Sequence, residues 1–446
     1  MRYIYIVAAA LLALNGSAGC GNQSGSKNDT PSAVAASAAD MSADGLRAEL
    51  ARTIGSLRTA SPDGSNAAAG AGPTDLGEWL ERLAAAYDAK REPLAISRFA
   101  LGDAAGTAVW ATALAVEPPP QSDGRPASRQ AVAVIVSAVD GGFRADTVPL
   151  PEGDSGLVRV EAVGDLTGDG VKEIVWRWGT TGAHTTTFGY TVSQRSSDGG
   201  WSVVPGTVGM PSVESFTLEN GALVLQGGLI GSAGAGPWQR ERTETYRYEA
   251  GAMKLADSVA SEGATAYHRL EDAVASESLG HRERAVRQYA EAARATDDSY
   301  KGLLFEYGGG VIEGGGDPQL EVDFGAAVRA LAAVRHYLLE LDGTRTEVAS
   351  DSSAASSGMT GPAVAGTTAP IQAPPLIDTR TLSGLPGLAE ALKGASNREQ
   401  AAETVKRWAE EHPEWLKLLN APYGYANRKW TAESASGIPE QPWPQG

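Results

Sequence analysis

The middle of the chain carries the pattern of β-strands. Between residues 93 and 260, β-branched and aromatic residues recur in twelve short runs, among them "AVAVIVSAV" and "RTETYRYEA". Such runs, with a period of two, are typical of strands that have at least one buried face. Turn sequences such as "SSDGG" and "LENG" separate them. Residues 93–260 are therefore predicted to form an antiparallel β-domain, either a sandwich or part of a propeller.

Beyond this region the apolar residues recur at helical spacing. Residues 261–345 are predicted to be helical, with a break near residues 278–280. Ala285, Tyr289 and Ala292 then follow at spacings that resemble the second helix of a tetratricopeptide repeat, where small residues let neighbouring helices approach closely. One such unit does not establish a repeat, so a generic alanine-rich helical hairpin remains the alternative.

Two further parts of the chain have helical patterns. Residues 75–92 place leucine, tryptophan and tyrosine side chains on one helical face. Residues 381–446 are predicted to form C-terminal helices and a tail, in which Asn397 begins the longer helix and Pro413 interrupts it. The pattern as a whole predicts a multidomain α+β chain, with an antiparallel β-domain followed by a helical, repeat-like domain.

The remaining long segments have no apolar period. Residues 21–74 are rich in Ala, Ser, Gly and Pro and are predicted to be a flexible tether. Residues 346–380 have a similar composition and are predicted to be a disordered linker. The totals of 54 glycines and 24 prolines agree with such unstructured parts.

The first twenty residues read as a lipoprotein signal peptide. Arg2 precedes an apolar run that ends at Leu14, which is too short for a lasting membrane span. Residues 17–20, "SAGC", resemble a bacterial lipobox, in which the cysteine becomes the acylated N-terminus. Cys20 is also the only cysteine in the chain. We expect a lipid on Cys20 to anchor the protein in the cell membrane or outer membrane, outside the cytoplasm. Ordinary cleavage near Ala18, which leaves a free thiol, is the alternative.

The overall charge bears on the choice of partner. The chain carries 37 Lys+Arg and 54 Asp+Glu, which gives a net charge of −17. Such a chain repels phosphate backbones, so nucleic acid is a poor candidate partner.

The acidic stretch "GDLTGDGVKE" lies between two predicted strands. Asp165, Thr167 and Asp169 alternate, and Glu173 follows four residues after Asp169. Side-chain oxygens at this spacing, with the carbonyl of Val171, suit calcium, which prefers six to eight oxygen ligands. A bidentate glutamate at loop position twelve is missing, so the loop is not an EF-hand. The stretch resembles the calcium loop of FG-GAP and VCBS-type β-repeats, and this resemblance implies a structural calcium ion. A metal-free acidic turn is the alternative.

His184 is the only histidine of the predicted β-domain. It lies in the segment "TGAHTT", but the sequence offers no nucleophile elbow to accompany it. The order of features resembles a group of bacterial lipoproteins that share a "GDLTGDG-x-x-E" loop, a "CGAHTC"-like segment and a helical tail that closes on "YGYANP". Thr181 and Thr186 stand where those relatives often have cysteines, and Arg428 replaces the proline. The resemblance implies an architecture and no particular activity.

These observations favour a non-enzymatic, membrane-anchored lipoprotein that acts as a binding or scaffold module at the cell envelope. Its partner is expected to be a protein or an extracellular polymer. An exported hydrolase that acts on cell-envelope material and a purely structural envelope component are the alternatives. Trp408, Trp415, Tyr423, Tyr425 and Trp430 make the C-terminal part rich in aromatic residues, which either cap the last helices or contribute to a binding site.

Overall fold

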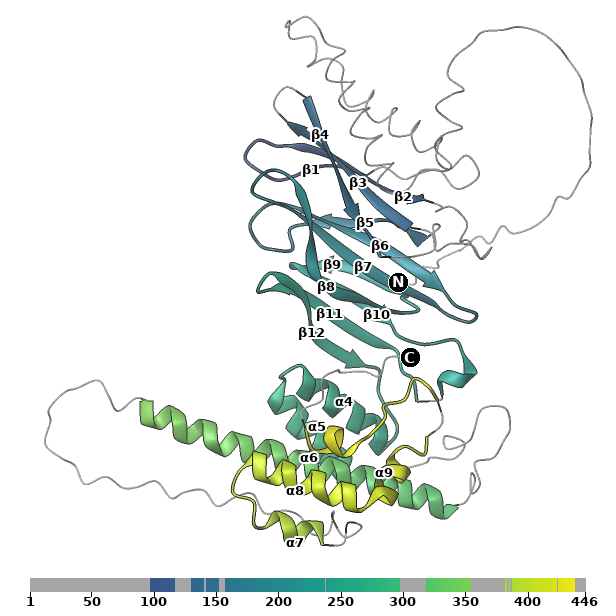
Figure 1. The fold of residues 1–446 in the computed structure, drawn as a ribbon, viewed down its shortest axis with the longest axis vertical. Coiled ribbons are helices and arrows are strands. Elements are labelled where there is room, and N and C mark those ends of the chain that lie inside the picture. Colours follow the sequence, from purple (N-terminus) through teal and green to yellow (C-terminus); the bar gives the residue numbers. More distant parts are fainter. Residues whose placement is uncertain are drawn as a thin grey trace, which may run out of the picture.

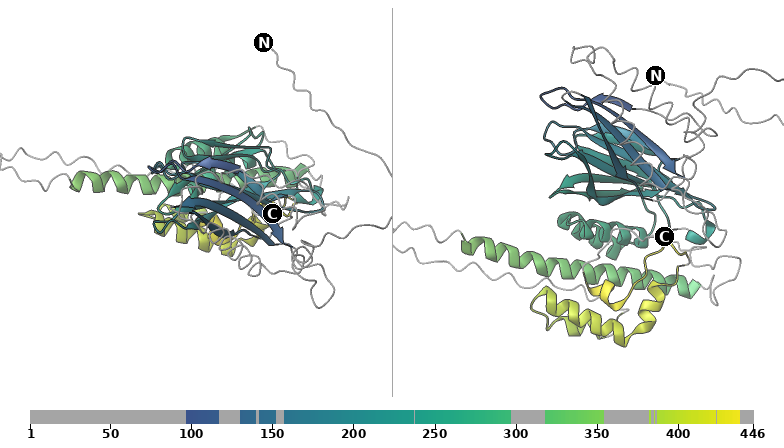
Figure 2. Two further views of the ribbon diagram at one scale, coloured as in Figure 1. Left: turned by 90° about the horizontal axis from the view of Figure 1, so that it is seen from above. Right: turned by 45° about the horizontal axis from the view of Figure 1, so that its top comes forward.

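The computed structural model describes residues 97–116, 130–139, 142–151, 157–236, 238–296, 318–353, 382, 385, 387–422 and 424–437. Three open antiparallel sheets are stacked one on another, and helices form a further layer beneath the third sheet (Figure 1). The stacking is visible in a second view as well (Figure 2, right). The α+β class, with an antiparallel β part followed by helices, is therefore confirmed.

Each sheet is a meander of four consecutive strands, so every pairing follows the order of the chain or its reverse. The first sheet contains β1 (Ser97–Ala100), β2 (Ala108–Val116), β3 (Gln130–Val139) and β4 (Gly142–Pro149). The second contains β5 (Arg159–Gly164), β6 (Glu173–Thr181), β7 (Thr186–Arg195) and β8 (Trp201–Pro211). The third contains β9 (Ser215–Glu219), β10 (Ala222–Gly227), β11 (Arg242–Glu249) and β12 (Ala252–Ala260). All twelve runs predicted from the sequence contain a strand.

Strand β6 shows how the sequence specifies the stack. Ile174 and Trp176 pack toward the first sheet, whereas Val175 packs toward the third. Successive side chains of a strand point to opposite faces, so a strand in the middle layer needs apolar residues at consecutive positions. The indole of Trp201 donates a hydrogen bond to Ser137 Oγ at 3.0 Å and so joins the second sheet to the first.

Three helix boundaries agree with those predicted from the sequence. Helix α4 ends at Ser278, Gly280 adopts a positive φ of 78°, and α5 begins at Arg282. Asn397 caps α8 by accepting a hydrogen bond from Gln400 N, and Pro413 begins α9. The helical elements are α4 (Ala266–Ser278), α5 (Arg282–Arg294), α6 (Pro318–Ser353), α7 (Leu388–Leu392), α8 (Arg398–Glu411), α9 (Pro413–Leu419) and α10 (Ala432–Ser436), together with a short 3₁₀ turn, η4 (Ala233–Ala235).

The disordered linker was predicted to begin at residue 346, and this boundary is wrong. Helix α6 continues to Ser353, so residues 346–353 are helical instead of part of a disordered linker. Once a helix is nucleated, each added residue forms one more backbone hydrogen bond, and the sequence has no proline or glycine between Thr344 and Ser353 to stop it. The signal peptide with Cys20, the tether 21–74 and the helix 75–92 lie outside the described residues, as does the remainder of the linker up to residue 380.

A buried ionic cluster joins five helices. Glu277 of α4 accepts hydrogen bonds from Tyr289 of α5, Arg335 of α6 and Arg398 of α8. The guanidinium of Arg335, whose residue is 1% exposed, also donates to the carbonyls of Ser434, Ala435 and Gly437 at and just after α10. The cluster thus ties the C-terminal segment to the helical hairpin, and this fixes the loop that precedes α10.

Candidate functional site

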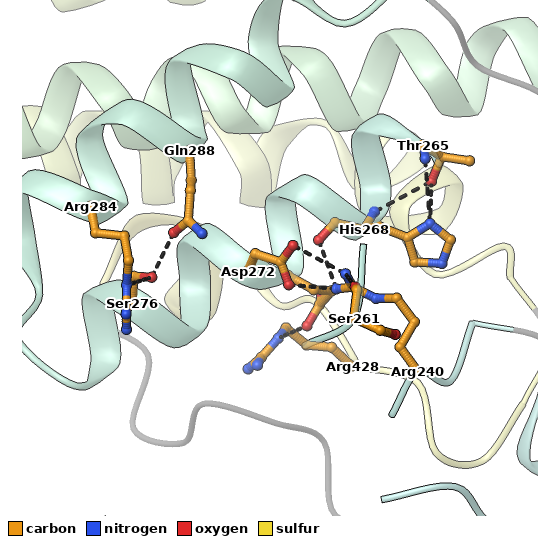
Figure 3. Close-up of polar contacts among 10 residues, drawn as sticks. Arg240, Ser261, Thr265, His268, Asp272, Ser276, Arg284, Gln288 and Arg428 are labelled. Carbon is orange, nitrogen blue, oxygen red and sulfur yellow. Dashed lines mark hydrogen bonds and ion pairs between the residues drawn. The ribbon is translucent and has the colours of Figure 1, made fainter. Parts of the chain in front are cut away.

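A cavity of about 830 Å³ lies where the second and third sheets meet helix α4 and the C-terminal segment. Its rim includes Thr180, Gly182, His184, Thr207 and Tyr425. Deeper positions carry aromatic and charged side chains, namely Trp238, Arg240, Arg242, Glu244, Tyr246, Tyr267, His268, Glu271 and Arg428. Figure 3 shows part of this wall, with Arg240 and Asp272 facing each other.

Close backbone contacts hold the rim together. A Cβ atom on Gly231 would lie 2.2 Å from the carbonyl oxygen of His184, so glycine is required there for the two loops to meet. The N–H of Gly231 donates to Thr185 Oγ1 at 2.6 Å. On the other side, Gly424 has a φ of 125°, and a Cβ on it would lie 2.3 Å from the carbonyl oxygen of Ala235. The β10–β11 connection therefore bridges the His184 loop and the C-terminal loop.

One side chain stiffens this connection from within. Gln239 accepts a hydrogen bond from Ile230 N at 2.6 Å and donates to the carbonyls of Ile230 and Gly236 at 3.2 and 3.1 Å. Tyr425, which follows Gly424 in the C-terminal loop, donates its N–H to Gly234 O in this connection at 3.0 Å. The cavity rim is thus made by three segments that hold one another in place.

The three arginines of the cavity wall are each paired with a carboxylate. Arg240 binds both oxygens of Asp272, at 2.5 and 3.1 Å, and also donates to the carbonyls of Ser261 and His268. Two further pairs complete the set, Arg242 with Glu244 at 2.6 Å and Arg428 with Glu271 at 3.0 Å. Their positive charge is therefore matched within the protein.

Burial shapes the ionisation of the tyrosines and of one histidine. Burial, with Glu271 close by, raises the pKa of Tyr267 well above its usual value of 10, so its hydroxyl stays neutral. Burial and the adjacent Glu244 act in the same direction on the pKa of Tyr246. Burial of the His268 imidazole, with Arg240 nearby, lowers its pKa to about 4. At neutral pH the side chains of Tyr246, Tyr267 and His268 are therefore uncharged.

His184 lies at the cavity rim and is exposed. Among the described residues, no hydrogen bond or ion pair joins its imidazole to a carboxylate, and no serine, threonine or cysteine is bonded to it. A histidine base normally has both an orienting group and a nucleophile within hydrogen-bond reach. The described part of the chain thus shows no assembled catalytic set at His184.

The acidic loop lies apart from the cavity and packs on the first sheet. Lys172 N donates to Leu101 O at 2.8 Å. Asp165 accepts the N–H groups of Gly168 and Gly170, and Asp169 accepts that of Val171. The loop carboxylates therefore already accept hydrogen bonds from the loop's own backbone.

Glu173 is the buried member of the loop, at 2% exposure. Its carboxylate accepts hydrogen bonds from Leu166 N at 2.7 Å and from Thr167 N at 3.3 Å. Burial raises its pKa, and the charges of Asp169 and Asp165 add to this effect. Within the described ranges, no group of three or more His, Cys, Asp or Glu side chains is arranged as a metal site. Calcium at Asp165, Thr167, Asp169, Val171 and Glu173 stays a prediction.

The aromatic residues of the C-terminal part fall into two groups. Trp408, Trp415 and Trp430 are 3–7% exposed and belong to the helical core. Tyr425 is 53% exposed and lines the cavity, whereas Tyr423 lies outside the described residues. Of these four described residues, three pack the last helices and Tyr425 is available to a ligand.

Sequence reasoning identified the His184 segment and the Tyr423–Arg428 segment separately, on resemblance. It did not identify Trp238, Arg240 or Glu271. The pairing of Arg428 with Glu271 spans 157 positions of the chain, and no local pattern signals it.

The chain matches no known family model, and no curated protein or solved structure is significantly similar to it. In the part of the chain that the structure describes, no helix is both long and apolar enough to cross a membrane.

Proposed function

We propose that this protein is a non-enzymatic, membrane-anchored lipoprotein and that the cavity between its sheets and helices binds a ligand at the cell envelope. The observation that carries the proposal is the cavity of about 830 Å³, which has the size of small-molecule sites and takes its walls from separate parts of the chain. The "SAGC" sequence at residues 17–20 supports the lipid anchor on Cys20.

Among the described residues, the lack of an assembled catalytic set at His184 favours binding over catalysis. The polar groups of the cavity wall are engaged in pairs, for example Arg242 with Glu244, whose second oxygen accepts a hydrogen bond from Tyr246 at 2.6 Å. Such pairs fix side-chain positions and suit recognition. The ligand is a chemical group presented by an envelope protein or an extracellular polymer.

The same proposal includes the finer architecture. The three stacked meanders form an open, propeller-like array that carries one calcium-type loop. The α4–α5 hairpin is tetratricopeptide-like, which is supported by Ala285, Tyr289 and Ala292, all 0% exposed at the interhelical contact.

Site-specific photo-crosslinking in intact cells tests this proposal. A photoreactive side chain at Tyr425 is expected to give a defined adduct, whereas the same group at Thr217, an exposed residue of β9 that does not line the cavity, gives none. Thr207→Trp, which fills the cavity from its rim, should remove the adduct, and Thr217→Trp should not. Equal labelling at both positions would contradict the proposal.

Two further measurements separate the alternatives. Cys20→Ser is expected to release the protein from the membrane fraction and to abolish incorporation of labelled fatty acid. If the protein hydrolyses envelope material, and His184→Ala folds but loses this activity, the hydrolase alternative would be supported in place of the binding function.

A further inference from the structure

Resting on the proposed binding function, we propose that the cavity recognises its ligand through a protonated primary amine that is bound by the carboxylate of Glu271. The inference concerns the chemical class of the ligand. The arginines of the cavity wall are already paired, whereas one buried carboxylate oxygen accepts no hydrogen bond.

Glu271 is the only described carboxylate with a buried oxygen that lacks a hydrogen bond. The residue is 6% exposed, and its Oε2 accepts a hydrogen bond from Arg428 Nε at 3.0 Å. Its Oε1 is buried and has no hydrogen bond of normal length and angle among the described residues; the neutral hydroxyl of Tyr267 is a neighbouring donor, and the carboxylate raises the pKa of that tyrosine. Leaving a buried acceptor unsatisfied is costly, and more so if it is charged. An acceptor in this position therefore favours a ligand that brings a donor.

The arginines argue against an anionic ligand. Arg240 and Arg242 are held by Asp272 and Glu244, and each also donates to backbone carbonyls. An incoming carboxylate or phosphate would have to displace these partners. Displacing a partner from a buried charge pair is costly because the displaced group loses its compensation.

Aromatic side chains surround the approach to Glu271. Tyr267 contacts Trp238 edge-to-face, with ring centroids 4.7 Å apart, and both line the cavity. Tyr425 presents a half-exposed ring at the rim. Ammonium groups are attracted to the faces of such rings, and more strongly where the site is desolvated. The Tyr267 hydroxyl lies near the same carboxylate and is neutral, so Arg428 is the only charge that the described contacts set against Glu271.

The test compares three probes of equal chain length on the purified protein, namely hexylammonium, hexanol and hexanoate. Hexylammonium alone is expected to bind, at millimolar concentration, as measured by calorimetry. Glu271→Gln keeps an oxygen for Arg428 and should weaken this binding at least tenfold, about 1.4 kcal/mol. Glu291→Gln, at an exposed position of α5, is the matched control and should bind as the wild type does.

A second readout covers the case in which Glu271→Gln does not fold. Met210 lines the cavity, and the chain has five methionines, so its methyl resonance can be assigned with Met210→Leu. Hexylammonium should shift this resonance in the wild type and not in Thr207→Trp.

Each other outcome overturns the inference. Binding of hexanol or hexanoate alone, abolished by Thr207→Trp, would refute the amine and leave the cavity as a binding site. Binding of hexylammonium that survives both Glu271→Gln and Thr207→Trp would place it elsewhere. Failure of all three probes would refute the amine, and the crosslinking at Tyr425 decides the binding function independently.

Discussion

Removal of the Arg335 side chain tests whether one buried cation holds the C-terminal segment, and with it one wall of the cavity, in place. In Arg335→Met the chain keeps a long apolar side chain and loses the guanidinium. Glu277 then loses its 2.6 Å ion pair, and the carbonyls of Ser434 and Gly437 lose donors at 2.9 and 2.8 Å. The substitution therefore removes a buried ion pair and also the donors to carbonyl groups at the end of α10.

The magnitude follows from these losses. Breaking a buried ion pair by removing one partner costs about 3–5 kcal/mol, because a charge is left uncompensated. Arg398 and Tyr289 still donate to Glu277, at 3.1 and 2.7 Å, and they offset part of that cost. The carbonyls that lose their donors add to the loss of stability. We expect the free energy of unfolding of the helical domain to fall by about 3 kcal/mol.

Urea unfolding followed by far-UV circular dichroism measures this loss. Arg407→Met removes an exposed arginine from α8 and should cost less than about 0.5 kcal/mol. In Arg335→Met/Glu277→Gln the buried charge is gone as well, so at least about 1 kcal/mol should be recovered. A loss below about 1 kcal/mol in the single variant, or no recovery in the double variant, would refute the role assigned to the cluster.

Three further predictions concern the loops and the cavity. Thr181 and Thr186 are directly paired across the β6–β7 hairpin, with hydroxyls 3.5 Å apart, so Thr181→Cys/Thr186→Cys should form a disulfide that non-reducing mass analysis detects and that adds roughly 2 kcal/mol. If the acidic loop binds calcium, chelation should lower the melting temperature, with a loss near 2.7 kcal/mol at calcium 100-fold above Kd, and Asp169→Ala should abolish the difference; an unchanged midpoint would remove the metal. The pKa of His268 is about 4 in the folded protein and 6.5 in the unfolded chain, so protonation favours unfolding. The free energy of unfolding should therefore fall as the pH drops from 6.5 toward 4, by on the order of 2 kcal/mol because His268 is partly exposed. His268→Gln keeps the capping box with Thr265 and should flatten this dependence, whereas an unchanged profile would contradict it.

The acidic loop shows how much a local pattern can establish. Its turn is made by contacts within ten residues, such as Asp165 with the N–H groups of Gly168 and Gly170. Such contacts depend on spacing alone, so the sequence predicts the turn. Whether a cation joins these oxygens depends on convergence in space, which spacing does not specify.

The cavity shows the opposite case. The closeness of Gly231 to the His184 carbonyl, and of Gly424 to Ala235, depends on how three distant loops fold back on one another. Gly231 and Gly424 are two of the 54 glycines in the chain, and no pattern of neighbouring residues distinguishes them from the others. The resemblance to bacterial lipoproteins pointed to two of the three loops, and the third was not identified.

Within the described residues, the sequence by itself determined the order of elements, namely twelve strands followed by helices, because alternation and helical spacing reflect interactions between near neighbours. Only the tertiary structure decided that the strands stack as three meanders and that Glu271 and Arg428 meet beside Tyr267. Contacts across more than a hundred residues are chosen by the packing of whole layers, and a pattern of a few residues carries no information about them.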